Sequence, residues 1–176
     1  MQVKVLGEYG YDFALLGLSL SYNQDPAKMK KVALQLAPKD FGHNKFLEMI
    51  YLWIDVAAPL YWWKQADTYR LSTKHSQSTM HTILKRPLTQ EDFEFPVPEV
   101  TLTRLNTLVS DGNFSAVVNE LPSGFLQRRV WVMNYKCLRN IIVQRRRHKL
   151  PEWRFFISEV LRQVEHPELL PSLEGL

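Results

Sequence analysis

The chain has 176 residues, of which 45% are hydrophobic and 12% aromatic, enough for one packed domain and too many for a disordered chain. Its net charge of +4 fits an anionic ligand, either a nucleotide phosphate or a nucleic acid, and is also common on proteins that bind neither. The single cysteine, Cys137, excludes an internal disulfide framework, and residues 46–63, the most apolar stretch, contain two acidic residues and a proline that argue against a membrane span. The start of the chain also lacks the pattern of a secretory signal. We therefore expect one cytoplasmic domain over residues 1–176.

The first part of the chain predicts an alternation of strands and helices. A helix is expected to open at Asp25 as N-cap with Pro26 at its first position, because both residue types favour those places. A short apolar run such as 47–56 is compatible with either a strand or a helix, and its β-branched and aromatic residues favour a strand. The expected elements are a strand at 1–7, a helix at 11–22, a helix from 26 to about 36, a turn at 39–44, a strand at 47–56 and a helix at 59–66.

The rest of the chain begins with a polar stretch, residues 68–81, which we interpret as a loop of the kind that often carries a site. The alternation in residues 126–133 predicts a strand with Trp131 and Met133 on one face. The five tryptophans are interpreted as core residues. The remaining expected elements are a linker at 91–98, helices at 100–109 and 115–120, a turn at 121–124, a helix at 135–145 and a closing helix from 152 to about 164.

Several kinds of chemistry are not indicated. The seven glycines form no phosphate-binding loop, and no GxSxG elbow is present for nucleophilic hydrolysis. The five histidines show no HExxH or comparable spacing, and one cysteine cannot form a thiolate cluster, so no metal site is predicted. For Cys137, burial as a small core residue is preferred over a reactive thiol, because free cysteines are usually buried.

Arginines are concentrated in the last third of the chain. An arginine fork suits both a phosphate and the edge of a pyrimidine, while a run of arginines is also typical of a solvated basic face or a nucleic-acid patch. Charge alone leaves these alternatives open. The residues concerned are Arg128, Arg129, Arg139, Arg145, Arg146 and Arg147.

The spacing of one segment is more specific. The run from Asn134 to Arg145 resembles the Asn-x-Arg-Ser-Leu-x-Asn-x-x-x-x-Arg pattern of flavin-dependent thymidylate synthases. The resemblance implies that Asn134, Lys136 and Asn140 contact FAD. It also implies that Arg145 is the catalytic arginine that grips the uracil ring, and that Arg128 binds the nucleotide.

The resemblance continues upstream and covers most of the chain. Residues 42–48 are similar to the family's Gly-His-x-(Thr/Ser)-x-x-Glu segment, in which Lys45 takes the Thr/Ser position and becomes an implied cofactor contact. An apolar strand, Pro59 and Gln65 then follow in the family's order. Residues 17–22 look like its Ala-Arg-Val-Ser-Tyr stretch.

The family's signature loop, Arg-His-Arg followed by Ser-x-Asn-Glu-x-Ser-x-Arg-Tyr, corresponds to residues 68–81 and is altered here. Thr68 and Tyr69 replace a basic pair, and Met80 replaces an arginine. The implied substrate-binding residues are Gln65, Arg70, Ser76 and Ser78, together with Arg128 and Arg145, and Ser78 is also implied at the catalytic centre. Tyr69 and Arg70 are implied cofactor contacts.

The resemblance implies an α/β (α+β) fold with a central antiparallel sheet and helices. It also implies a homotetramer with active sites between subunits. The implied reaction uses FAD, recharged by NADPH, to transfer a carbon unit from methylenetetrahydrofolate to C5 of dUMP, by methylation or hydroxymethylation. The altered signature leaves two alternatives: a catalytically inactive family member, or a basic nucleic-acid-binding module. Of the expected partners, a mononucleotide is preferred over a nucleic acid, and no membrane is expected.

Overall fold

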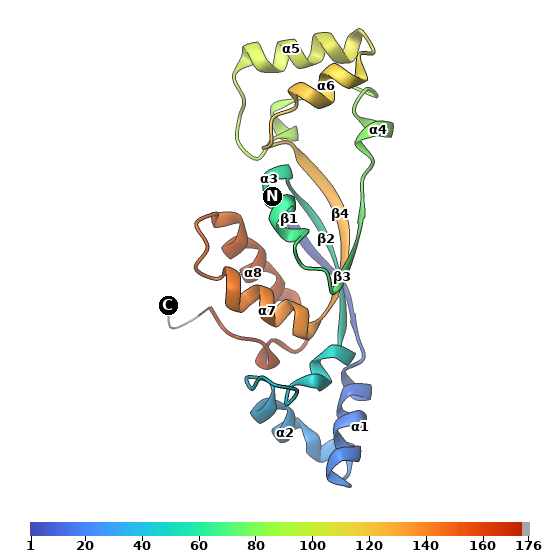
Figure 1. Cartoon of the computed structure of the whole chain (residues 1–176), viewed down its shortest axis with the longest axis vertical. Helices are drawn as coiled ribbons and strands as arrows, with labels where there is room; N and C mark the ends of the chain where they lie inside the picture. Colours follow the sequence, from blue (N-terminus) through green and yellow to red (C-terminus); the bar gives the residue numbers. More distant parts are fainter. Residues whose placement is uncertain (174–176) are drawn as a thin grey trace. The chain divides into compact units, whose positions relative to one another are not determined.

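The computed structural model describes residues 1–173 and contains an antiparallel four-stranded sheet with strand order β1-β2-β4-β3 (Figure 1). The sheet and its helices confirm the predicted α/β (α+β) class. The strands are β1 (Gln2–Tyr9), β2 (Tyr51–Pro59), β3 (Ser72–Ser76) and β4 (Leu126–Asn134).

Helices supply the rest of the regular structure. Within residues 1–173, no helix is long and apolar enough to cross a membrane. The α-helices are α1 (Tyr11–Tyr22), α2 (Met29–Leu36), α3 (Leu60–Ala66), α4 (Thr79–Thr82), α5 (Glu99–Ser110), α6 (Phe114–Glu120), α7 (Tyr135–Arg145) and α8 (Pro151–Gln163). Four short 3-10 helices are η1 (Pro26–Lys28), η2 (Lys45–Met49), η3 (Gln90–Asp92) and η4 (Pro167–Leu169).

The predicted helices are largely confirmed, and the polar loop is not. Residues 68–81 contain β3 and α4, so their prediction as a loop is wrong. β3 is an edge strand with little buried surface, so it does not need alternating apolar residues. For that reason the sequence carries no strand pattern there. The strand predicted at 47–56 begins at Tyr51, because residues 45–49 form η2. Asp25 caps η1 by accepting a hydrogen bond from the Ala27 N–H (2.9 Å), and α2 itself starts only at Met29.

The chain divides into two compact units, and each is described by itself. The first unit comprises Met1–Gln2, Val56–Thr68 and His75–Arg129. Its core lies between α5, α6 and the segment before them, and Phe93 packs edge-on against Phe125 with 6.0 Å between ring centroids. The buried residues of this core are Ile83, Leu88, Phe93, Leu105, Leu108, Val109 and Val117.

The second unit comprises Val3–Asp55, Tyr69–Lys74 and the chain from Val130 onward. Its core joins the inward face of β2 and β4 to α7 and α8, and the Trp131 ring stacks on Phe156 at 5.6 Å. The core interpretation holds for four tryptophans and is wrong for Trp53, which is 37% exposed. Trp53 lies on the opposite face of β2 from the buried Leu52 and Ile54, where it contacts the edge of Tyr9 at 5.6 Å.

Candidate functional site

A cavity of about 470 Å³ lies in the second unit, beside the first turns of α7. Three of the residues that line it, Asn134, Lys136 and Asn140, are those that the sequence pattern assigns to a cofactor. The end of β4, residues 71–73 and the start of β2 supply other parts of the wall. Lys136 and Asn140 are four positions apart and so lie on the same face of α7, and Asn134 is the residue that caps the start of the helix.

Asn134 is fixed by its role as the N-cap of α7. Its Oδ1 accepts a hydrogen bond from the Cys137 N–H at 2.9 Å, which is the usual geometry of an asparagine cap. The side-chain carbonyl is therefore committed to the helix, and the amide NH₂ is the group that Asn134 offers as a donor. The N-terminus of α7 also carries a partial positive charge that favours an anionic ligand group.

Lys136 forms an ion pair with Glu48 at 3.0 Å, and both side chains are partly exposed. Exposed pairs of this kind contribute little to stability, so Lys136 can exchange its partner for a ligand at low energetic cost. Glu48 lines this cavity and the neighbouring one. Glu48 was not among the predicted site residues. The sequence did offer a signal for it, because Glu48 is the glutamate that ends the Gly-His segment, three residues after Lys45.

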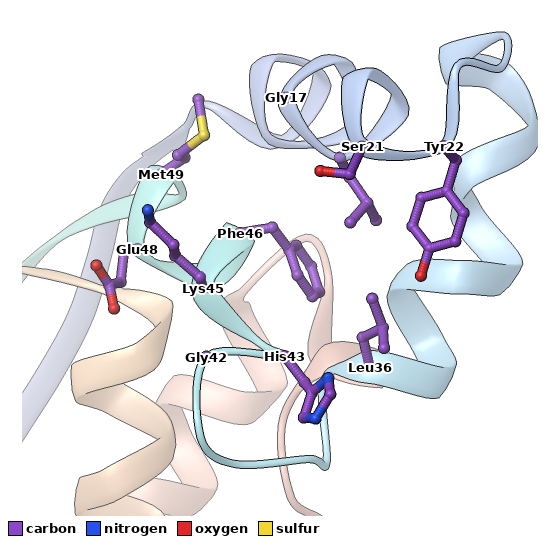
Figure 2. A pocket seen from close by; sticks show the side chains of 11 residues that line it. Gly17, Ser21, Tyr22, Leu36, Gly42, His43, Lys45, Phe46, Glu48 and Met49 are labelled. Carbon is purple, nitrogen blue, oxygen red and sulfur yellow. The ribbon is translucent and has the colours of Figure 1, made fainter.

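The neighbouring cavity, of about 480 Å³, lies between α1, α2 and η2 in the same unit (Figure 2). Phe46, Tyr22 and Leu36 give it an apolar wall, and Lys45 and Glu48 supply opposite charges. Lys45, the implied cofactor contact, is an exposed residue of this second cavity rather than of the first.

Arg145, at the C-terminal end of α7, is held by aromatic residues. Its Nε donates a hydrogen bond to the Tyr69 hydroxyl at 2.9 Å, and that hydroxyl lies 3.0 Å from Gln144 Oε1. The guanidinium carbon lies 5.1 Å from the centroid of the Trp153 ring, within cation–π range. Burial raises the pKa of Tyr69, and the hydrogen bond and charge of Arg145 oppose that rise only in part. The hydroxyl therefore stays protonated at neutral pH, accepting from Arg145 and donating to Gln144.

Arg145 and Tyr69 are thus brought together, although the sequence assigned them to different ligands. Trp153, which supports both, was treated only as a core residue, and no sequence signal placed it beneath Arg145. Arg70 follows Tyr69 and is exposed.

The other implied substrate residues belong to the first unit. Gln65 lies in α3, Ser76 ends β3, Ser78 precedes α4, and Arg128 is an exposed residue of β4. The Arg128 carbonyl accepts a hydrogen bond from the Gln77 N–H at 2.8 Å, so the backbone between the two serines is fixed to β4. Ser78 is exposed, and its side chain does not cap α4.

Two arginines of the basic run have structural partners instead. Arg129 pairs with Asp67 at 2.9 Å and lies over the Trp63 ring at 4.4 Å. Arg139 pairs with Asp40 at 3.0 Å and donates to the Pro38 carbonyl at 2.7 Å. Both side chains are less than 15% exposed, so they are poorly placed to form part of a basic surface for nucleic acid.

Solved structures identify the fold. The chain superposes on thymidylate synthase X (ThyX) from Helicobacter pylori with FAD and dUMP, with a TM-score of 0.86, 17% identity and complete coverage of both chains. The chain has the ThyX fold. A second structure, the flavin-dependent thymidylate synthase ThyX from Helicobacter pylori complexed with FAD and dUMP, gives a TM-score of 0.84 at 18% identity over 97% of this chain and 98% of the other.

A third neighbour with the same fold is the UMP/dUMP methylase PolB from Streptomyces cacaoi bound with 5-Br dUMP. Its TM-score is 0.69 at 12% identity, over 92% of this chain and 88% of PolB. No protein-family model and no curated sequence matches this chain. The ThyX fold is therefore carried here by a sequence that is at most 18% identical to those of these structural neighbours.

Proposed function

We propose that this chain is a member of the flavin-dependent thymidylate synthase family that transfers a one-carbon unit from methylenetetrahydrofolate to C5 of dUMP. FAD is the proposed cofactor and NADPH the proposed reductant. One observation carries the proposal: Asn134, Lys136 and Asn140, which the family pattern assigns to the flavin, line a single cavity in a chain with the ThyX fold. The two Helicobacter pylori structures with that fold hold FAD and dUMP.

The polar side chains of the cavity suit a flavin nucleotide in their chemistry. A volume of about 470 Å³ lies within the usual range of ligand pockets. The amide groups of Asn134 and Asn140 match the carbonyls and N–H groups of a flavin ring, and the Lys136 ammonium matches a phosphate. FAD, when bound, supplies the redox chemistry of the reaction.

The protein's own part is orientation and electrostatics. Arg145 is proposed to hold the uracil ring and to stabilise negative charge on it, because a guanidinium stays positive and offers fixed donors. Tyr69 and Trp153 limit the positions that Arg145 can take. Gln65, Arg70, Ser76, Ser78 and Arg128 are the proposed contacts of the nucleotide.

A homotetramer with shared sites is proposed as the active assembly. In its support, α1 exposes Phe13, Leu16 and Leu20, which are 69%, 48% and 77% exposed and recur at helical spacing. A contiguous apolar face of this kind is typical of a protein–protein interface. Light scattering on the purified protein measures the assembly directly.

A catalytically inactive, nucleotide-binding protein is the second candidate. The favouring observation is Tyr69: where the family has a basic residue that contacts the flavin, this chain has a hydroxyl already bonded to Arg145. This candidate predicts that dUMP binds without turnover.

The deciding experiment is the visible absorption spectrum of the protein after incubation with FAD and removal of free cofactor. We expect retained flavin bands that change when dUMP is added, and formation of a C5-substituted product when methylenetetrahydrofolate and NADPH are present. Asn140→Ala is expected to lose the flavin, whereas Asn119→Ala, the same change at an exposed position of α6, keeps it. A colourless wild-type protein contradicts the proposal, and a flavin-bound protein that binds dUMP without turnover supports the second candidate.

A further inference from the structure

The second unit leaves one face of its sheet exposed. α7 and α8 pack on the face that carries the buried residues Leu52, Ile54 and Trp131, and the alternate residues of these strands point to the other side. The apolar residues on that side are between 37% and 68% exposed, except for one partly buried valine. We define them as the outer sheet face, which consists of Leu6 and Tyr9 of β1, Tyr51 and Trp53 of β2, and Val130 and Val132 of β4.

Three aromatic side chains form the centre of the outer sheet face. The Trp53 ring contacts Tyr9 of the neighbouring strand and lies 6.4 Å from the Tyr51 ring, two positions earlier. Gly7 leaves space for the Tyr9 ring to lie across β1, because a Cβ atom there would approach that ring to 2.9 Å. Tyrosine and tryptophan are enriched in protein–protein interfaces, and a contiguous exposed apolar patch marks an interaction site.

The charged residues on this side of the sheet balance each other. Within the unit, β1 contributes Lys4 and β2 contributes Asp55, one positive and one negative. A nucleic acid requires a basic surface, which this face does not provide. A second copy of the same face brings no excess of like charge. Antiparallel sheets also pack face to face, about 10 Å apart, with side chains that interdigitate. The chemistry of the face therefore fits a second copy of this chain.

The proposed homotetramer requires more than one interface. An isologous interface uses the same patch on both partners, so one such patch joins two chains and leaves none for a third. A tetramer with two-fold symmetry therefore needs two different patches on every chain. The exposed face of α1, with Phe13 and Leu16, supplies one of them. The outer sheet face adjoins it, since Tyr9 and Phe13 line the same cavity.

We propose that the outer sheet face is the second interface between copies of this chain, with two such faces packed around Trp53. The inference rests on the homotetramer of the proposed function and assigns one of its interfaces. Tyr51 and Val132 belong to this face and also line the proposed FAD cavity. A partner copy on the face lies beside that cavity, so FAD affinity depends on the assembly. The interface also explains why Trp53 is exposed in the single chain.

The test is sedimentation velocity of the full-length protein without FAD. We expect the wild type to sediment as a tetramer and Trp53→Glu as a dimer, because an unpaired charge at the centre of the sheet interface leaves only the α1 interface. Leu16→Glu is expected to leave only the sheet interface and to give a dimer as well, and the double variant a monomer. Phe155→Glu, at an aromatic residue of α8 with 43% exposure, is the matched control and should remain a tetramer. A tetrameric Trp53→Glu, or a monomeric wild type, overturns the proposal.

A second measurement covers the case in which Trp53→Glu fails to fold. Iodide quenches the fluorescence of tryptophans that it can reach, and Trp53 is exposed in the single chain whereas the other four tryptophans are buried. If the outer sheet face is covered in the assembly, iodide quenches the wild type no more than Trp53→Phe, which lacks the reporter but keeps an aromatic ring. Stronger quenching of the wild type shows that Trp53 is open to solvent and overturns the proposal.

The effect on FAD separates this inference from the proposed function. Trp53 is not a lining residue of the FAD cavity, so a loss of affinity in Trp53→Glu arises from the missing partner copy. We expect the dissociation constant for FAD to rise by at least about tenfold in the dimer, equivalent to roughly 1.4 kcal/mol. An unchanged dissociation constant overturns the dependence of FAD on the assembly. A tetrameric wild type that binds no flavin contradicts the proposed function, whereas its dissociation by Trp53→Glu still supports the interface.

Discussion

The Tyr69 hydroxyl accepts a hydrogen bond of 2.9 Å from Nε of Arg145, 76 residues further along the chain. The Tyr69 ring also lies edge-on to Trp153, with 6.1 Å between centroids. This contact connects the segment before β3 to the C-terminal end of α7 within the second unit. If Arg145 holds the uracil ring, as proposed, Tyr69 is its positioning residue.

Tyr69→Phe tests this relationship. The substitution keeps the ring beside Trp153 and removes one hydrogen bond to a charged group, worth roughly 1.5–3 kcal/mol. Solvent exposure of the pair reduces that value, so we expect the KM for dUMP to rise by about three- to tenfold. Steady-state kinetics measure the change. Gln144→Ala, which removes the other partner of the hydroxyl, is expected to have a smaller effect, and an unchanged KM in Tyr69→Phe argues against a positioning role.

We predict that the role of Arg145 depends on the planar, forked set of guanidinium donors and not only on the positive charge. Lysine keeps the positive charge but cannot form the same planar set of donors, so Arg145→Lys is expected to lower kcat/KM by about a hundredfold. Arg145→Ala is expected to abolish turnover. Arg147→Lys, at an exposed position two residues further on, is the control and should leave kcat/KM unchanged. Turnover that survives in Arg145→Ala would show that another residue activates the pyrimidine.

Helix α7 and strand β3 show how far the sequence determines the fold. The bounds of α7 were predicted in full because Leu138, Ile141 and Ile142 recur at helical spacing, and all three are buried in the structure. β3 was missed because an exposed edge strand needs no apolar residues, and its pairing depends on β4, which lies fifty residues later in the chain. Local sequence patterns show which side chains are buried, and β3 has few buried side chains.

The candidate site divides in the same way. Asn134, Lys136 and Asn140 are close in sequence and share one helix end, so a linear pattern was able to group them around one cavity. Trp153 beneath Arg145, and Tyr69 beside it, come from separate elements that meet only in the folded chain. Glu48 belongs to a segment that the family pattern recognised. Its contact with Lys136, 88 positions away, arises only in the folded chain.

Cys137 is expected to be an unreactive thiol. Its 6% exposure confirms the predicted burial, and burial raises its pKa, with the charge of Lys74 opposing that rise only in part. At pH 8 the thiol of the native protein is therefore expected to stay protonated and to react with a disulfide reagent far more slowly than the unfolded chain does. Rapid stoichiometric labelling of the native protein would support the alternative of a reactive cysteine.

Gly10 is predicted to be the glycine least tolerant of substitution in the second unit. It joins β1 to α1 with a φ of +102°, and a Cβ atom there would collide with the backbone carbonyl oxygen of Met49. Gly42 provides a matched control in the same unit, because its φ is +91° but a Cβ atom there meets nothing within 4 Å. Gly42→Ala is expected to lower the free energy of unfolding by only about 1–2 kcal/mol, the cost of the left-handed backbone conformation.

Gly10→Ala carries the same conformational cost and adds a collision with backbone that no side-chain rotation relieves. We therefore expect a loss of about 3–5 kcal/mol, which is large for a single substitution and comparable to much of a domain's stability. Urea denaturation followed by tryptophan fluorescence measures both variants, since Trp131 and Trp153 are buried in this unit. Equal losses in the two variants would mean that the chain between Gly10 and Met49 relaxes to admit the methyl group, and that backbone conformation alone requires glycine there.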